Sequence, residues 1–224
     1  MKKLMKNLKV NNSVHIYLRC NQTMKLFFLA CILSSISMTA NTVHAENKKI
    51  KLDSAIIKGL TSGEYVILLR HALAPGFGDP NSFDVSDCLS QRNLSEQGRQ
   101  QAIDIGKLLK ANGIQQASIF SSQWCRCIET AQLLDLGKVS ALPIINSFYQ
   151  RFERKTEQTQ QLKEWLIRNN RTNKNPVSSA TILVTHQVNI SAIANVFANS
   201  GEIVIIKTDN FGKVTVMAQV QTSQ

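Results

Sequence analysis

Two histidines hold equivalent positions in this chain, each at the end of a short hydrophobic segment. His71 ends the segment 65–71 and His186 ends the segment 181–186, and both segments are rich in β-formers. Such segments are typical of buried strands in a parallel sheet, where ligands bind just beyond the carboxyl ends. A single histidine at a strand end is more often structural than catalytic. Two of them, the first preceded by Arg70, predict a catalytic site at this edge.

A third segment adds a cation to the same edge. Residues 117–122 have the composition of a strand, and residues 124–135 have helical spacing, with Arg126 in the first turn. Free backbone N–H groups and the helix dipole favour an anion at this end, so a cation there is unfavourable unless an anion binds. The alternative is an exposed arginine that pairs with Glu129. Together with Arg70, His71 and His186, Arg126 predicts a pocket for a phosphoryl dianion.

Four segments, in order, resemble motifs of the histidine phosphatase superfamily, which has the phosphoglycerate-mutase-like fold. The first matches Arg-His-Gly, the second Leu-Thr-x-x-Gly-x-x-Gln-Ala, the third Ser-Ser-x-x-x-Arg-Ala-x-x-Thr-Ala, and the fourth contains the second histidine. Each motif alone is weak, but four in order with the right spacing are specific. They lie at residues 69–72, 94–102, 121–131 and 184–186, and the matching region runs from about residue 64 to about 198, which is most of the chain after residue 45.

The resemblance implies a role for each matching residue. His71 would attack phosphorus and form a phosphohistidine, which divides one difficult displacement into two easier ones. Arg70 and Arg126 would hold the phosphoryl oxygens, and His186 would donate to the same oxygens. No metal or other cofactor is expected. Ala72 replaces the usual glycine, which requires a backbone conformation that tolerates a Cβ atom.

The acid that would protonate the leaving group is not at either usual place. In the family it is commonly a Glu shortly after the third strand or an Asp directly after the second histidine. Residues 142–152 contain no acid, and Gln187 follows His186. Glu153 is the nearest replacement, although a solvated glutamate between Arg151 and Arg154 is the simpler interpretation. Three acids of the loop after the nucleophile are weaker candidates: Asp79, Asp84 and Asp87.

These observations predict a metal-independent phosphatase that acts on a phosphomonoester or a phosphoramidate through a phosphohistidine. General acid catalysis is typically worth about 10²–10⁴-fold, and phosphoramidates or esters with good leaving groups need it least. The alternative, from another class, is a secreted phosphate-group binding protein, an inactive phosphatase homologue without the acid. The expected partner is a phosphorylated small molecule or an envelope saccharide.

Residues 1–45 have the features of a presequence. Met24-Lys25, an apolar stretch at 26–33 and the small-x-small sequence Val43-His44-Ala45 predict a secretory signal peptide cleaved after Ala45. Met24 opens a complete signal by itself, so we expect it to be the true start. The apolar stretch is too short for a stable membrane span. The prediction is a periplasmic or secreted protein with one histidine-phosphatase-like domain at residues 46–224.

The basic composition is partly a property of this presequence. The whole chain has 26 basic and 15 acidic residues, giving a net charge of +11. Six of the basic residues and none of the acidic ones lie in residues 1–45, so the remainder carries 20 and 15, or +5. This modest excess suits an anionic substrate and gives no indication of nucleic-acid binding, for which no motif is present.

The pattern of elements predicts an α/β fold. It is a three-layer α/β/α sandwich whose central sheet is mostly parallel, with an antiparallel C-terminal hairpin at 202–207 and 213–220. Residues 72–91, which contain glycine and proline, form a loop that could wall the pocket. The expected helices lie near 53–60, 95–111, 124–135, 156–170 and 188–199.

Three cysteines remain after the predicted cleavage. Cys125 and Cys127 flank Arg126 on one helix and face different directions, so they should not pair with each other. In an oxidising compartment we expect Cys88 to form a disulfide with one of them. The alternative is three reduced, buried thiols.

Overall fold

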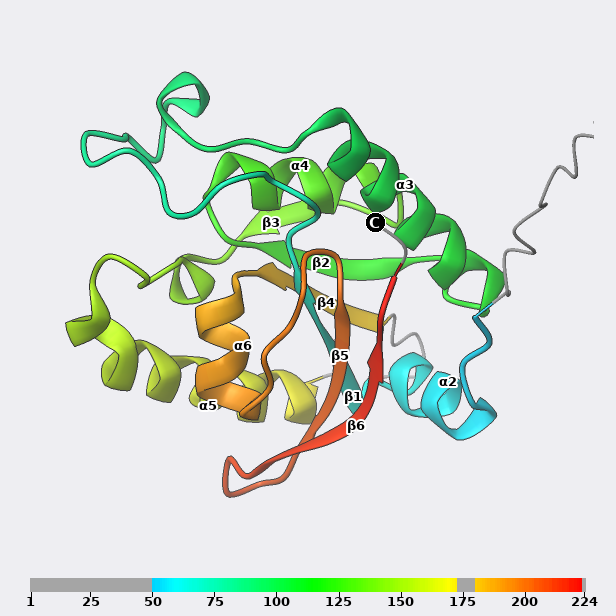
Figure 1. Ribbon diagram of the computed structural model, residues 1–224. Helices are drawn as coiled ribbons and strands as arrows, with labels where there is room; N and C mark the ends of the chain where they lie inside the picture. Colours follow the sequence, from blue (N-terminus) through cyan, green and yellow to red (C-terminus); the bar gives the residue numbers. More distant parts are fainter. Residues whose placement is uncertain (1–49, 173–179, 223–224) are drawn as a thin grey trace, which may run out of the picture. The chain divides into compact units, whose positions relative to one another are not determined.

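The computed structural model describes residues 50–172 and 180–222, and the predicted presequence lies outside them. One six-stranded sheet forms the centre of this part (Figure 1), in the order β3-β2-β4-β1-β5-β6. Strands β1 (Tyr65–Arg70), β2 (Ala117–Ser121), β3 (Val139–Ala141) and β4 (Ala180–Thr185) pair in parallel. Strands β5 (Ile203–Thr208) and β6 (Val214–Val220) form an antiparallel hairpin, and β5 also pairs antiparallel with β1. The predicted mostly parallel sheet with an antiparallel end is therefore confirmed.

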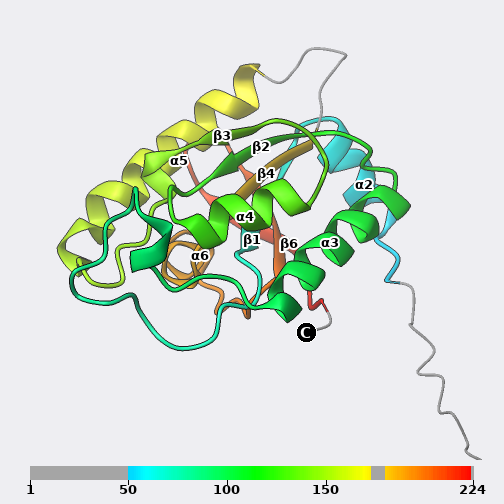
Figure 2. The ribbon, with the colours of Figure 1, turned by 90° about the horizontal axis from the view of Figure 1, so that it is seen from above.

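Helices cover both faces of the sheet, which gives the three predicted layers (Figure 2). Helices α2 (Ser54–Thr61), α3 (Glu96–Ala111) and α4 (Cys125–Leu133) pack on one face, and α5 (Lys155–Thr172) and α6 (Gln187–Ala194) on the other. Alternate residues of β1 enter the two cores: Ile67 and Leu69 face α2–α4, whereas Val66 and Leu68 face α5 and α6. The period of two along a strand produces this division.

The boundaries follow local signals. Ser95 caps α3, as predicted, because its Oγ accepts a hydrogen bond from the Gly98 N–H over 3.0 Å. The helix predicted to reach residue 199 ends at Ala194 instead, since Asn195 adopts a left-handed conformation with φ 54°. Strand β3 was not predicted, because three residues are too few to show a period of two.

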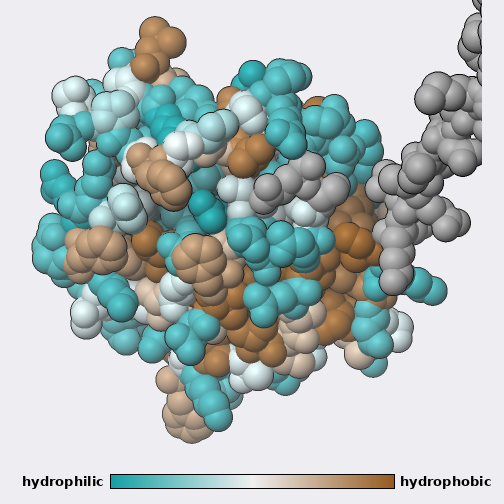
Figure 3. All heavy atoms as spheres, in the orientation of Figure 1, coloured by the Kyte–Doolittle hydropathy of each residue, from teal (hydrophilic) through white to brown (hydrophobic). Residues whose placement is uncertain are grey.

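Hydrophobic and hydrophilic side chains occupy different parts of the surface. Figure 3 shows hydrophobic side chains gathered on the part of this face that lies over α2, β5 and β6, and mostly hydrophilic ones above α3 and the loop before it. None of the described helices is both long and apolar enough to cross a membrane.

Candidate active site

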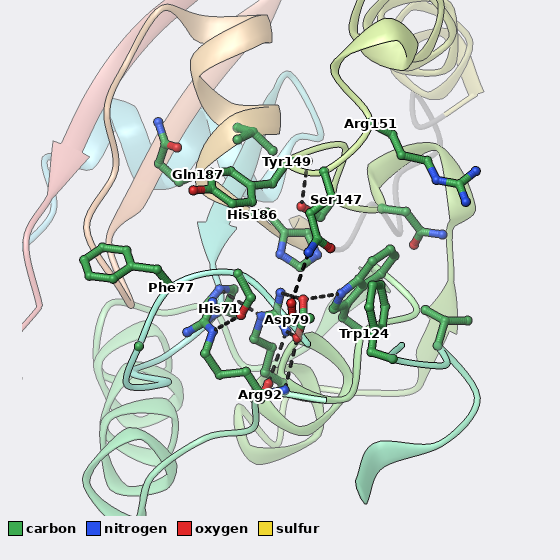
Figure 4. Close-up of a pocket in the computed structure, with 18 of the residues that line it drawn as sticks. His71, Phe77, Asp79, Arg92, Trp124, Ser147, Tyr149, Arg151, His186 and Gln187 are labelled. Atoms are coloured by element: carbon green, nitrogen blue, oxygen red, sulfur yellow. Dashed lines mark hydrogen bonds and ion pairs between the residues drawn. The ribbon is translucent and has the colours of Figure 1, made fainter. Parts of the chain in front are cut away.

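The register of the sheet brings the two predicted histidines together. Strands β1 and β4 are neighbours in which Arg70 pairs with Thr185, so the residues that follow them, His71 and His186, are adjacent. The backbone N–H of His71 donates to the Thr185 carbonyl over 2.9 Å, and the two imidazole centroids lie 5.5 Å apart. Both side chains are buried at the base of one pocket (Figure 4).

The hydrogen bonds of His71 define its tautomer. Its Nδ1 lies 2.8 Å from the Ala72 carbonyl oxygen, which only accepts, so Nδ1 carries the proton and Nε2 the lone pair. The Nε–H of Arg126 donates to that Nε2 over 3.3 Å. Burial, followed by the positive charge of Arg126, lowers the pKa of His71 well below 6.5. The imidazole is therefore neutral at physiological pH and its Nε2 is available as a nucleophile.

His186 is held by the loop between β2 and α4. Its Nε2 lies 2.9 Å from the Oγ of Ser122 and 3.5 Å from the Sγ of Cys127, and the Trp124 ring packs against its imidazole. Ser122 Oγ is in turn 3.2 Å from Oδ1 of Asn146, which fixes the hydroxyl. Burial, then the charge of Arg126, also lowers the pKa of His186 well below 6.5. His186 is therefore a neutral hydrogen-bonding group.

Arg126 occupies the first turn of α4, as predicted, but it is buried and not paired with Glu129. Glu129 instead accepts a hydrogen bond from Arg99 over 3.3 Å. Two nitrogens of Arg126, Nη1 and Nη2, donate to the two carboxylate oxygens of Asp79 over 2.8 and 3.0 Å. This bidentate pair lies beside the histidines, with side chains only 3% and 5% exposed. The exposed-arginine alternative is thus wrong.

The loop that carries Asp79 is anchored by Arg92. The guanidinium of Arg92 donates to the carbonyls of Gly78, over 2.9 Å, and of Ala74, and its backbone N–H donates to Asp79 Oδ1 over 3.0 Å. Gly76 and Gly78 have φ values of 91° and 63°, which side chains other than glycine rarely adopt. The sequence between 72 and 91 therefore builds a wall around the pocket, as expected.

A disulfide joins this wall to α4. Cys88 is bonded to Cys125, which resolves the choice between the two predicted partners. Cys127 is the remaining thiol of the described residues and is buried. Burial raises the pKa of Cys127 to about 12, so this thiol is unreactive at neutral pH.

The second motif supports the loop after His71 from α3. Leu73, two residues after His71, accepts a hydrogen bond from the Ser95 N–H over 3.1 Å and donates its own N–H to Gln101 Oε1 over 2.9 Å. Gly98 lies so close that a Cβ atom there would be 2.0 Å from the Leu73 carbonyl oxygen. Ala72 is tolerated at the position where the family usually has glycine, because its φ is not positive.

The pocket has a volume of about 1310 Å³ and is lined by many cations. Arg70 donates through Nη1 to the Ala198 carbonyl over 2.9 Å, while its buried Nε has no partner among the described residues and is available to an anion. Exposed aromatic rings of Phe77, Tyr149 and Phe197 also line the pocket. The lining arginines are Arg70, Arg92, Arg126, Arg151 and Arg154.

The structure does not bring Glu153 to this pocket. Glu153 is exposed in a short 3₁₀ helix, Phe152–Arg154, and is not among the lining residues. Gln187 lines the pocket but donates to Ser191 over 2.7 Å. The acids that line it in the described part of the chain are Asp79 and Asp84. Burial, the largest single cause, would raise the pKa of Asp79, but the hydrogen bonds and charge of Arg126, together with hydrogen bonds from Arg92 and Trp124, outweigh it and lower the pKa.

Sequence reasoning missed three residues that shape the site. Arg92 and Asn146 line the pocket, and Trp124 donates through Nε1 to Asp79 Oδ2 over 3.0 Å. Asn146 lies within residues 142–152, the region in which the family resemblance places the acid, and that position was the available signal. Within residues 50–172 and 180–222, no three His, Cys, Asp or Glu side chains are grouped so as to hold a metal ion.

Comparison with known proteins agrees with this fold. The sequence profile of the histidine phosphatase superfamily (branch 1) matches residues 66–176, and the chain belongs to that superfamily. A structure of the protein histidine phosphatase SixA complexed with tungstate is 14% identical, covers 70% of this chain and 96% of its own, and has a TM-score of 0.52. The structure of mycobacterial hydrolase 1 is 13% identical, covers 71% and 99%, and has a TM-score of 0.53. No curated protein sequence matches significantly.

Proposed function

We propose that the protein is a metal-independent phosphatase that works through a phosphohistidine on His71. The observation that carries this proposal is the Nε2 lone pair of His71, fixed by the Nδ1–H bond to Ala72 and lying 3.3 Å from the Nε of Arg126. A neutral, oriented nucleophile beside a permanent cation is what attack on a phosphoryl dianion requires.

The chemistry has two steps. In the first, Nε2 of His71 forms a bond to phosphorus while the bond to the leaving group breaks, and the leaving group departs with the bonding electron pair. In the second, water attacks phosphorus, the P–N bond breaks, Nε2 recovers its lone pair, and the protons of the water leave with the released phosphate. Arg70 and Arg126 would hold the phosphoryl oxygens in both steps, and His186 would donate to them. Most of the acceleration comes from position and fixed positive charge.

The carboxyl groups of the pocket restrict the leaving group. Asp79 is held as a carboxylate by Arg126, and the pKa of the exposed Asp84 is lowered by the backbone N–H of Ser86. Neither supplies a proton at neutral pH. We therefore expect phosphoramidates and esters with good leaving groups to react faster than alkyl phosphates. The related SixA structure is described as a protein histidine phosphatase, and phosphohistidine is such a phosphoramidate.

The test is turnover together with trapping of the intermediate. Protein treated with a chelator should hydrolyse p-nitrophenyl phosphate, and rapid quenching should trap acid-labile phosphate on His71. His71→Ala should lower kcat by at least roughly a thousandfold, because the covalent path is removed. Full activity of His71→Ala, or loss of wild-type activity with the chelator, would contradict the mechanism.

A second candidate is a phosphate-group binding protein that has lost efficient catalysis. It is favoured by the lack of a proton-donating acid at the pocket in the described part of the chain. Tight binding of vanadate, a mimic of the pentacoordinate state, without turnover of any phosphoester or phosphoramidate would support it.

The pocket suits a substrate larger than phosphate. A volume of about 1310 Å³ with exposed aromatic rings and Arg151 and Arg154 leaves room for an organic group beyond the phosphoryl site. A phosphorylated small molecule or an envelope saccharide fits the predicted export of the chain, and that export remains a proposal. Turnover of a panel of both substrate types would identify the class.

A further inference from the structure

The ion pair between Asp79 and Arg126 has a geometry that bears on how a phosphoryl group binds. A guanidinium has five N–H donors in one plane. In Arg126, Nη1 donates to Asp79 Oδ1 over 2.8 Å and to the Arg92 carbonyl over 3.1 Å, and Nη2 donates to Asp79 Oδ2 over 3.0 Å. Three of the five donors, all on Nη1 and Nη2, are thus hydrogen-bonded to Asp79 and to the Arg92 carbonyl.

The other two donors are the Nε–H and the second hydrogen of Nη2, which lie along one edge of the plane. The Nε–H already points at Nε2 of His71, 3.3 Å away. A phosphoryl group bonded to that Nε2 would meet this edge, where two parallel N–H groups match two oxygens. The end-on pair with Asp79 therefore leaves this edge facing His71, where the reaction needs it.

We propose that Asp79 is a positioning residue, which holds Arg126 by its end so that the Nε/Nη2 edge faces the phosphoryl group on His71. This inference rests on the proposed function. Asp79 acts through Arg126 and need not touch the substrate.

Asp79 is itself held in place, as a positioning group must be. Besides the two Arg126 donors, its oxygens accept from Trp124 Nε1 and from the Arg92 N–H, both over 3.0 Å. Gln150 fixes its backbone by donating to the Asp79 carbonyl over 3.0 Å. Figure 4 shows Asp79 between His71, Trp124 and Arg92 at the base of the pocket. Its negative charge also offsets the repulsion among the neighbouring arginines.

A competing idea makes the opposite prediction. If the Asp79 carboxylate occupied the place of the substrate's phosphoryl group, its removal would strengthen anion binding. If it positions Arg126, its removal weakens binding, because a freed guanidinium loses its alignment. The sign of one affinity change separates the two ideas.

The experiment measures vanadate binding to the wild-type protein, Asp79→Asn, Arg126→Ala and the double variant by calorimetry. We expect Asp79→Asn to weaken binding about tenfold or more, and to have no further effect once Arg126 is alanine. The matched control is Asp87→Asn: Asp87 is in the same loop, is exposed and caps a 3₁₀ helix, a role that asparagine also fills, so its affinity should stay unchanged. Equal or tighter binding by Asp79→Asn, or an equal loss in the Arg126→Ala background, would overturn the inference.

A structure of the wild-type protein with vanadate gives an answer even if Asp79→Asn does not fold. Vanadate on Nε and Nη2, with Asp79 still on Nη1 and Nη2, supports the inference, whereas displacement of Asp79 overturns it. Failure of the proposed function looks different, since the wild-type protein would then turn over no substrate, whether or not it binds vanadate. Wild-type turnover with unchanged vanadate affinity in Asp79→Asn would refute the positioning role alone.

Discussion

The two histidines of this site differ in the hydrogen bonds that hold them. His71 and His186 are both neutral and buried, but Nε2 of the first carries a lone pair that accepts from Arg126, whereas Nε2 of the second is engaged by Ser122. One fixed carbonyl, that of Ala72, decides which nitrogen of His71 carries the lone pair. Preorganisation of this kind avoids a reorganisation cost during the reaction.

At the residue scale we expect Glu153→Gln to be neutral. Glu153 is exposed and outside the pocket, so the loss of its charge should change kcat/KM for p-nitrophenyl phosphate less than about twofold, within the usual range for a surface substitution. Steady-state kinetics across pH 5–8 would check this. A loss of a hundredfold or more, greatest for substrates with poor leaving groups, would instead identify Glu153 as the general acid.

Four residues of the site could be predicted from the sequence, because each lies beside a local pattern that marks the end of a strand or the start of a helix. Arg70, His71, Arg126 and His186 all lie where a strand ends or a helix begins, and parallel strands bring such ends together. Asp79 could not be assigned in this way, since its place depends on the path of an irregular loop. Contacts across that loop, such as the bond from Trp124, leave no periodic signal in the sequence.

At the scale of elements, the site depends on how the pocket wall is attached. The disulfide between Cys88 and Cys125 joins the wall to the first residue of α4, next to Arg126. Gln91 adds a second link, because its Oε1 accepts the Cys125 N–H over 3.0 Å. A covalent bond and a hydrogen bond thus link the loop that carries Asp79 to the helix that carries Arg126.

Removal of this disulfide should destabilise the fold and the site together. The bridge spans 37 residues of sequence, and the chain-entropy model assigns about 4 kcal/mol to a loop of that length. We expect Cys88→Ser/Cys125→Ser to lose about that much unfolding free energy in urea and to bind vanadate less tightly. Reductant should weaken the wild-type protein and leave the double variant unchanged. Equal effects of reductant on both would show that the bridge does not form in solution.

At the scale of the whole molecule, the structure places two neutral histidines inside a site surrounded by arginines. The unfolded chain exposes both imidazoles to water, where they take up protons below their ordinary pKa of 6.5. The folded chain does not, because burial and the charge of Arg126 hold both pKa values well below 6.5. Under these conditions the unfolded state binds more protons, and stability falls as the pH falls.

The free energy of unfolding should therefore decrease between pH 7.5 and pH 5.5. If both histidines stay neutral in the fold, they contribute together a loss of roughly 3 kcal/mol by pH 5.5. The lowered pKa of Asp79 acts in the same direction only near and below its ordinary value of 3.8, outside this window. Urea unfolding at several pH values measures the change, and His71→Gln should show about half of it. A wild-type stability that stays constant across this range would mean that the histidines titrate equally in the folded and unfolded states, and hence that the neutral nucleophile is wrongly assigned.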